Sequence, residues 1–327
     1  MEKEIVQVTE RKTGVAVVDL LAQTIERFLS SLDTKPITKD TYKKALRVFE
    51  IWIKDKGYLH PTRENILEYK EYLKARTIVG NDGEIKTLSP LTVTAYLTAL
   101  RRFFAFLEAE KLYPNIARDV KGLKRPKGFL KETLTKEEAL RLLDGIKKDN
   151  ANDIRDYAMI NLMLRTGLRT IEVARVSVGD IGRETGETVL RVWGKGRDSK
   201  DDFVILTDKA YTPILDYLQA RGQTKLSEPI FSSHSNRNKA EALTTRSIRR
   251  IIEDRLKAVG LKTAKVTAHS LRHTAGTIAL LNGADILSVK EMLRFTSHSL
   301  SLPGRTFSFT NTLEQPANVN YQNFENV

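Results

Sequence analysis

The sequence predicts a mainly α-helical protein with a small β-sheet, organised in two domains. The chain has 327 residues, which is enough for two domains that each bury a hydrophobic core. Apolar residues recur at three- and four-residue spacing through the first third of the chain, as in amphipathic helices. Beyond residue 134 the pattern becomes mixed, because helical segments stand on both sides of two short strand-like runs.

Four helices are expected in the first third of the chain. The first three cover Val17 to Leu32, Thr38 to Lys56 and about Thr62 to Ala75. The dipeptide Ser89-Pro90 is typical of a helix start, since serine caps the first turn and proline fits the first helical position. Together these helices predict an all-α domain over residues 16–112, preceded by an N-terminal tail of residues 1–15.

A segment rich in proline, glycine and positive charge follows the four helices. Pro114, Gly122 and Pro126 prevent a long helix between residues 113 and 133, and the positive charges repel one another. We interpret the segment as an extended basic linker that contacts a polyanion; a solvated connector without a binding role is the alternative. The basic residues expected to make contact are Lys121, Lys124, Arg125 and Lys127.

The second domain is expected over residues 134–300, with both helices and strands. Thr135 and Glu138 have the spacing of a capping box, which begins its first helix. Val189 to Trp193 and Phe203 to Leu206 read as strands joined by the turn Gly194-Lys195-Gly196-Arg197-Asp198. Helices are expected at about 135–147, 153–166, 171–176, 208–221, 245–259, 270–282 and 285–294. Helical periodicity is lost after Ser299, and residues 301–327 are expected to form a C-terminal tail.

The composition favours a polyanionic partner and excludes several kinds of chemistry. Lysine and arginine number 54 against 41 acidic residues, a net charge of +13 that is typical of nucleic-acid binding, although other basic proteins share it. The chain contains no cysteine, which excludes disulfides, thiolate metal sites and cysteine nucleophiles. No apolar run approaches the roughly 20 residues that span a bilayer. We therefore expect a cytoplasmic, nucleoid-associated protein.

Three local patterns in the second domain carry side chains suited to phosphate chemistry. Arg169 follows a glycine break, in Thr166-Gly167-Leu168-Arg169, and stands at a helix start. Lys195 lies between two glycines at the hairpin turn, so its ammonium group can project. His269-Ser270-Leu271-Arg272-His273 enters a later helix. Each pattern alone has an ordinary explanation. An arginine near a helix start is usually part of a surface ion pair, a lysine between glycines is common in turns, and two histidines four apart often share a helix face. Two histidines four apart can bind zinc, but no glutamate follows His269, and no metal or cofactor is expected.

Together and in this order, the patterns resemble the signature of the tyrosine recombinase (phage-type integrase) family. That signature has an arginine in a G-L-R-x-x-E context, a lysine on a β-hairpin, and then H-x-L-R-H. The resemblance covers nearly the whole chain, because residues 16–112 also resemble the family's SAM-like core-binding domain. It implies that residues 134–300 form an α+β catalytic domain, which cuts and rejoins DNA through a 3′-phosphotyrosine intermediate.

The resemblance also implies a role for each motif residue. Arg169 and Arg272 would clamp the scissile phosphate, since guanidinium groups stabilise negative charge on its non-bridging oxygens. His269 would position or activate the phosphate, and Lys195 would protonate the leaving 5′-oxygen as a general acid. Glu172 would support Arg169 structurally. Because the covalent intermediate conserves the bond energy, neither ATP nor a metal is required.

The end of the chain departs from the family pattern. The family's second histidine or tryptophan, commonly in an L-G-H context, falls on Phe295, and its tyrosine falls near Gly304. A Pro-Gly step at that point would break the short helix that presents the nucleophile. His298 is the candidate for the missing role, and Tyr321 is the candidate nucleophile. Tyr321 could act in its own protomer or in a neighbour, it could be an ordinary tail residue, or the end of an incomplete enzyme could have been replaced.

Double-stranded DNA is the partner that the resemblance implies, held in a C-shaped clamp and bound by a tetramer. Candidate contacts on the first domain are Lys43, Lys44, Thr92, Tyr96, Arg101 and Arg102. Those on the second domain are Arg246, Arg249 and Arg250, which share one expected helix. No membrane and no small-molecule substrate is expected.

Site-specific strand exchange, as in mobile-element or phage integration and excision, is the first functional hypothesis. The alternative is a catalytically incomplete DNA-binding protein with an accessory or regulatory role. A type IB topoisomerase would share the same residues, but the core-binding domain argues against it.

Overall fold

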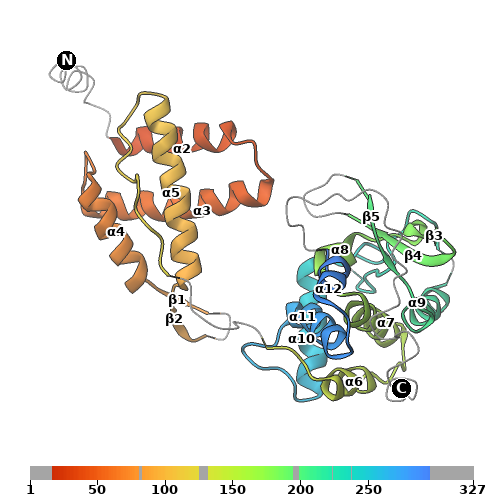
Figure 1. The fold of residues 1–327 in the computed structure, drawn as a ribbon. Coiled ribbons are helices and arrows are strands. Elements are labelled where there is room, and N and C mark those ends of the chain that lie inside the picture. Colours follow the sequence, from red (N-terminus) through yellow and green to blue (C-terminus); the bar gives the residue numbers. More distant parts are fainter. Residues whose placement is uncertain are drawn as a thin grey trace. The chain divides into compact units, whose positions relative to one another are not determined.

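The computed structural model describes residues 17–80, 83–124, 132–193, 199–222, 224–236 and 238–294. The chain divides into two compact units, Met1–Gly128 and Phe129–Val327. Helices dominate both units, and each has its own small sheet (Figure 1). The mainly helical fold predicted from the sequence is therefore confirmed.

In its described residues, the first unit contains four helices and one short hairpin. The helices are α2 (Val17–Ser31), α3 (Pro36–Lys56), α4 (Arg63–Ala75) and α5 (Pro90–Ala109). Strands β1 (Thr77–Val79) and β2 (Ile85–Thr87) pair in antiparallel fashion between α4 and α5, and neither was predicted from the sequence. The core is aromatic, with Phe49 packed edge-on against both Tyr69 and Phe104. This aromatic packing holds the helices together.

Local sequence explains where α5 begins, and buried apolar residues explain where the chain runs after it. Ser89 caps the helix by accepting a hydrogen bond from the Thr92 backbone N–H at 3.1 Å, and Pro90 occupies the first turn, as predicted. After α5 the chain stays on the first unit, because Ala117 and Val120 are buried in the same aromatic core. The first part of the expected linker thus packs against the helices.

In its described residues, the second unit combines helices with a three-stranded antiparallel sheet that lies to one side of them (Figure 1). Its elements are α6 (Lys136–Asp144), α7 (Ala151–Thr166), α8 (Thr170–Arg175), η1 (Val178–Asp180), β3 (Ile181–Glu184), β4 (Glu187–Val192), β5 (Asp202–Ile205), α9 (Asp208–Arg221), α10 (Thr245–Ala258), α11 (Ala268–Leu281) and α12 (Ile286–Met292). The sheet order is β3-β4-β5. Thr135 and Glu138 form the expected capping box at the start of α6.

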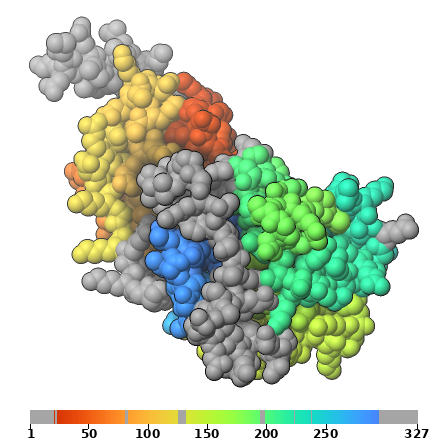
Figure 2. Space-filling view, turned by 45° about the vertical axis from the view of Figure 1, so that its right-hand side comes forward, coloured from red at the N-terminus to blue at the C-terminus, as the bar shows by residue number. Residues whose placement is uncertain are grey.

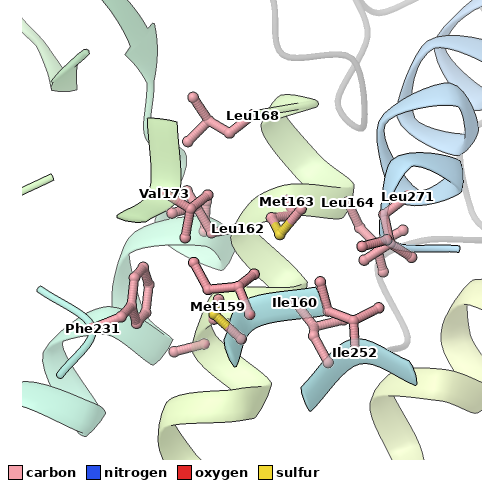
Figure 3. Packing of buried hydrophobic residues seen from close by; sticks show 14 of the residues in the cluster. Met159, Ile160, Leu162, Met163, Leu164, Leu168, Val173, Phe231, Ile252 and Leu271 are labelled. Atoms are coloured by element: carbon pink, nitrogen blue, oxygen red, sulfur yellow. The ribbon is translucent and has the colours of Figure 1, made fainter. Parts of the chain in front are cut away.

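Helix α7 is the centre of the second unit. It is apolar on nearly every side, which is typical of a helix enclosed by others. Met159 and Met163 on α7 lie among Val173 of α8, Ile252 of α10, and Phe231, which lies between α9 and α10 (Figure 3). Because this packing fixes α7, it also fixes the turn at the C-terminal end of the helix, from which the candidate site is built.

The predicted hairpin is present in the second unit. Strands β4 and β5 pair with Val189 opposite Ile205 and Val192 opposite Asp202. The turn at 194–198 that joins them, which includes Lys195, lies outside the described residues. The sheet (green) and the last described helices (blue) both reach the surface on one face (Figure 2). Within the described ranges, no helix is long and apolar enough to cross a membrane.

Candidate active site

Arg169 is placed by the turn between α7 and α8. Gly167 ends α7 at φ +63, and a Cβ atom there would lie 2.4 Å from Leu293 Cδ2, so the turn requires glycine. Arg169 then caps α8. Its backbone N–H donates to Glu172 Oε2 at 2.7 Å, and its Nη1 donates to Oε1 at 2.7 Å. The expected support of Arg169 by Glu172 is therefore present.

Arg272 lies in the first turns of α11 and is almost fully buried. Only 2% of the residue is exposed, yet its guanidinium has backbone acceptors on two sides. Nη1 donates to the Gly167 carbonyl at 2.5 Å, and Nη2 donates to the Leu293 carbonyl. Burial and the nearby positive charge of Arg169 lower the pKa of Arg272 to about 10. The group remains charged at neutral pH, and two positive charges at one site favour a bound anion.

The predicted phosphate ligands share one cavity of about 360 Å³. Arg169, His269 and Arg272 all line it, although Arg169 is 100 residues distant from His269 in the sequence. The other lining residues are Met163, Leu168, Thr170, Arg249, Glu253, Thr267 and Ala268. Two guanidinium groups and an imidazole around one cavity are suited to bind a phosphodiester. The sequence predicts Arg249 as a DNA contact but gives no sign of its place in this cavity.

The two histidines of the motif have different surroundings. His269 is exposed at the cavity, and its ring lies edge-on to that of His273 with centroids 4.6 Å apart. His273 is half-buried, and burial together with the Arg272 charge lowers its pKa. His273 is therefore neutral at physiological pH and packs beside His269 without adding charge.

A buried charge network that the sequence analysis missed lies behind Arg169. Glu172, with 4% of its side chain exposed, shares its carboxylate between Arg169 and Arg294, whose Nη2 donates to Oε2 at 2.7 Å. Burial raises the pKa of Glu172, but Arg294 and Arg169 lower it by more, so the pKa is below its ordinary value. Arg294 Nε lies 3.5 Å from Asp202 Oδ2. Burial raises the pKa of Asp202, and Arg294 offsets part of that rise.

Arg294 follows α12 in an unusual backbone conformation. Its φ is +48, in the left-handed region that favours glycine. The sequence signal was its position, because Leu293-Arg294-Phe295 stands where the family commonly has L-G-H. The side chain is only 8% exposed and points into the charge network. An arginine here therefore gains two carboxylate partners at a backbone position suited to glycine.

Several expected site residues lie outside the described part of the chain. They are Lys195, His298, Tyr321, Arg125 and Lys127. The strands on either side of Lys195 are described, and Asp202 on β5 approaches Arg294. The strand that follows the lysine turn therefore contacts, through Asp202, the charge network behind Arg169.

The DNA-contact candidates of the first unit lie on α3 and α5, apart from two that follow α5. Arg102 approaches the ring of Tyr42, 5.9 Å from its centroid, and so joins α5 to α3. Lys43 forms an ion pair with Glu26 at 2.8 Å, while Tyr96 packs partly against the aromatic core. The remaining candidates here are Lys44, Thr92, Arg101, Lys121 and Lys124; the three lysines are exposed, and the other two are partly buried.

The candidates of the second unit share one helix. Arg246, Arg249 and Arg250 are exposed on α10. Arg250 lies 3.8 Å from Asp254, one turn along the same helix. Because Arg249 also lines the cavity, α10 connects the candidate phosphate site to an exposed basic surface.

The sequence is similar to the phage integrase family and to individual tyrosine recombinases. The model of the phage integrase family matches residues 132–300. The tyrosine recombinase XerC of Thermodesulfovibrio yellowstonii is 31% identical over 223 residues, which cover 66% of this chain and 71% of that protein. The tyrosine recombinase XerA of Pyrococcus furiosus is 28% identical over 284 residues, 86% of this chain and 88% of that protein.

Solved structures share the fold. The XerH recombinase bound to its palindromic difH substrate matches with a TM-score of 0.62 at 22% identity, over 80% of this chain and 74% of that chain. The lambda integrase tetramer bound to a Holliday junction matches with a TM-score of 0.63 at 16% identity, over 89% of this chain and 81% of that chain.

A helical unit joined to a catalytic-type unit with two arginines at one cavity defines a class of DNA-breaking and rejoining proteins. The chain belongs to the phage integrase family of tyrosine site-specific recombinases. The predicted family, fold class and enzyme class are confirmed.

Proposed function

We propose that this protein carries out site-specific strand exchange on double-stranded DNA through a 3′-phosphotyrosine intermediate. The observation that carries the proposal is the common cavity of Arg169, His269 and Arg272. A scissile phosphate in this cavity would meet two guanidinium groups that stabilise charge on its non-bridging oxygens. Arg249 lines the same cavity and adds a further donor on the side of α10.

The proposed reaction assigns each bond change to a side chain. The Tyr321 hydroxyl gives its proton to the His269 imidazole and its oxygen attacks phosphorus, so a tyrosine–phosphate bond forms as the bond to the 5′-oxygen breaks. Lys195 gives its proton to that leaving oxygen. His269 positions the phosphate during both steps. Attack by the 5′-hydroxyl of a second DNA then reverses the chemistry and releases the tyrosine, with no net loss of bond energy.

The proposed biological setting is integration and excision of a mobile element or phage, by a tetramer on DNA. The match to the phage integrase family and the tetramer formed by lambda integrase on a Holliday junction support this proposal. Sequencing of DNA that becomes covalently attached to the protein in cells tests it. Attachment at the two ends of one element is expected, and attachment at a single chromosomal site would argue for a different role.

A suicide substrate tests the chemistry. In a pool of nicked duplexes with a randomised site, the cleaved fragment diffuses away and leaves the protein attached to DNA. Wild type should form this adduct, Tyr321→Phe should not, and Tyr211→Phe on α9 is the matched control. Mass spectrometry of the adduct identifies the attached residue directly. An adduct that persists in Tyr321→Phe would show that another residue is the nucleophile.

A DNA-binding accessory protein without chemistry is the second candidate. The sequence observation in its favour is Leu302-Pro303-Gly304-Arg305, which stands where the family spacing places the tyrosine. This candidate predicts that wild type binds the same duplexes but forms no adduct under any condition. Binding measured by fluorescence anisotropy beside the suicide assay separates the two candidates.

A further inference from the structure

The network of Arg294 connects two parts of the site that are distant in sequence. One carboxylate, Glu172, belongs to α8 and holds Arg169. The other, Asp202, belongs to β5, the strand after the Lys195 turn. Arg294 contacts both, with Nη2 at 2.7 Å from Glu172 and Nε at 3.5 Å from Asp202.

We propose that Arg294 is a positioning residue that fixes β5, the strand after the Lys195 turn, against the arginine pair by binding Glu172 and Asp202 together. The inference rests on the proposed function, since it assigns Arg294 to the geometry of that reaction. Three observations support it: the side chain of Arg294 is buried, its backbone adopts a left-handed conformation, and both of its partners are carboxylates.

The contact with Glu172 controls how Arg169 is held. Glu172 Oε1 accepts from the Arg169 side chain, while Oε2 accepts from Arg294 Nη2 as well as from the Arg169 backbone N–H. If Arg294 were absent, both oxygens could pair with the Arg169 guanidinium in the two-pronged geometry that arginine favours. The Glu172 carboxylate would then neutralise the Arg169 guanidinium and occupy the donors that a phosphate needs. Arg294 therefore keeps donors of Arg169 available to the cavity.

The contact with Asp202 controls the hairpin. Arg294 Nε is buried without a hydrogen-bond partner, and the Asp202 carboxylate at 3.5 Å is its ion-pair partner. Asp202 pairs with Val192 in the sheet, so the contact between Arg294 and Asp202 also fixes the end of β4. Val192 and Asp202 stand on either side of the turn that carries Lys195. A general acid must lie within hydrogen-bond reach of the leaving oxygen, so the position of this hairpin decides how well Lys195 functions.

A substrate with sulfur in place of the bridging 5′-oxygen tests the hairpin contact. A thiolate leaves without protonation, because a thiol is far more acidic than an alcohol, so the general acid becomes dispensable. We expect Asp202→Asn to slow single-turnover cleavage of the oxygen substrate roughly 10-fold or more, as a misplaced reacting group would. Cleavage of the sulfur substrate should stay within about twofold of wild type. Arg169→Ala should slow both substrates alike.

Two outcomes of this assay would overturn the proposal. One is equal slowing of both substrates by Asp202→Asn, and the other is an unchanged rate on the oxygen substrate. Arg191→Gln is the matched control, because Arg191 forms an exposed ion pair with Glu184 at 2.7 Å on the same sheet. This control should leave both rates unchanged.

A titration that needs no cleavage tests the contact with Glu172. Nitrogen-15 NMR reports the Nε–H signals of Arg169 and Arg272 while tungstate, a phosphate mimic, is added to the full chain. Arg294→Met should shift the Arg169 signal and weaken tungstate binding at least about threefold, whereas Asp202→Asn should not. An unchanged Arg169 signal and affinity in Arg294→Met would overturn the proposal. If wild type cleaves neither substrate, the proposed function fails, and this titration still decides the role of Arg294.

Discussion

Replacement of Arg169 by alanine should slow DNA cleavage roughly 10²- to 10³-fold while leaving DNA affinity nearly intact. The guanidinium lines the cavity with 22% of its side chain exposed, so it can reach a bound phosphate. Donors that stabilise developing charge contribute about 2.7–4 kcal/mol in the transition state, which corresponds to roughly 10²- to 10³-fold in rate. On the proposed function, binding of the uncleaved duplex would depend on many phosphate contacts, of which this would be one.

The structure also indicates that the Arg169→Ala variant will fold. Glu172 would keep its ion pair with Arg294 and the hydrogen bond from the backbone N–H of residue 169. The lost contact should cost about 1–3 kcal/mol, less than the stability of a typical domain. Arg272→Ala is less suitable, because it would leave the buried carbonyls of Gly167 and Leu293 without their donor.

The assay compares two quantities on one protein sample. Single-turnover cleavage of the nicked suicide substrate gives the rate, and fluorescence anisotropy on the matching intact duplex gives the affinity. The reasoning fails if Arg169→Ala loses affinity on the same scale as it loses rate, since the arginine would then have a structural role. Thermal unfolding of the variant serves as the control for folding.

Three further changes have defined outcomes. Gly167→Ala should destabilise the protein by about 1–3 kcal/mol, since its Cβ would lie 2.4 Å from Leu293 Cδ2 at a positive φ; an unchanged urea midpoint would contradict this. Because Glu172 has a lowered pKa, its stabilisation is complete above the ordinary value of 4.5 and is lost as the pH falls through the lower folded value. The free energy of unfolding should thus decline more steeply below pH 4.5 in wild type than in Glu172→Gln, and parallel pH profiles would refute this. DNA affinity should weaken steeply with salt, and Arg249→Gln should reduce the slope of log K against log salt by about 0.9, the value for one phosphate contact; an unchanged slope would place Arg249 away from the phosphates.

Local signals in the sequence were sufficient to predict the helices and one hairpin. Ser89-Pro90 and the capping box of Thr135 and Glu138 begin helices where expected, because caps satisfy backbone groups within one turn. Strand β3 was missed, since Ile181-Gly182-Arg183-Glu184 lacks alternating apolar residues and gains its place by pairing with β4. Strands β1 and β2 were missed because each is only three residues long and all of these residues are exposed, so neither shows an apolar pattern.

The candidate site was predictable only where residues belong to motifs. Arg169, His269 and Arg272 were named from their local patterns, and the fold brings them to one cavity. The role of Arg294 could not be read from spacing, because its partners lie on α8 and β5, more than 90 residues earlier in the chain. A charged side chain just after a helix is ordinary in sequence. Its burial between two carboxylates is a property of the folded chain alone.

The acceptors of the two arginines have a consequence for synthesis of the protein. Arg272 donates to the carbonyl of Leu293, and Arg169 Nη2 approaches that of Arg294 at 3.4 Å. During translation, both arginines leave the ribosome before these acceptors do. The nascent chain therefore holds an unassembled arginine cavity until residues 293 and 294 have emerged and α12 has docked.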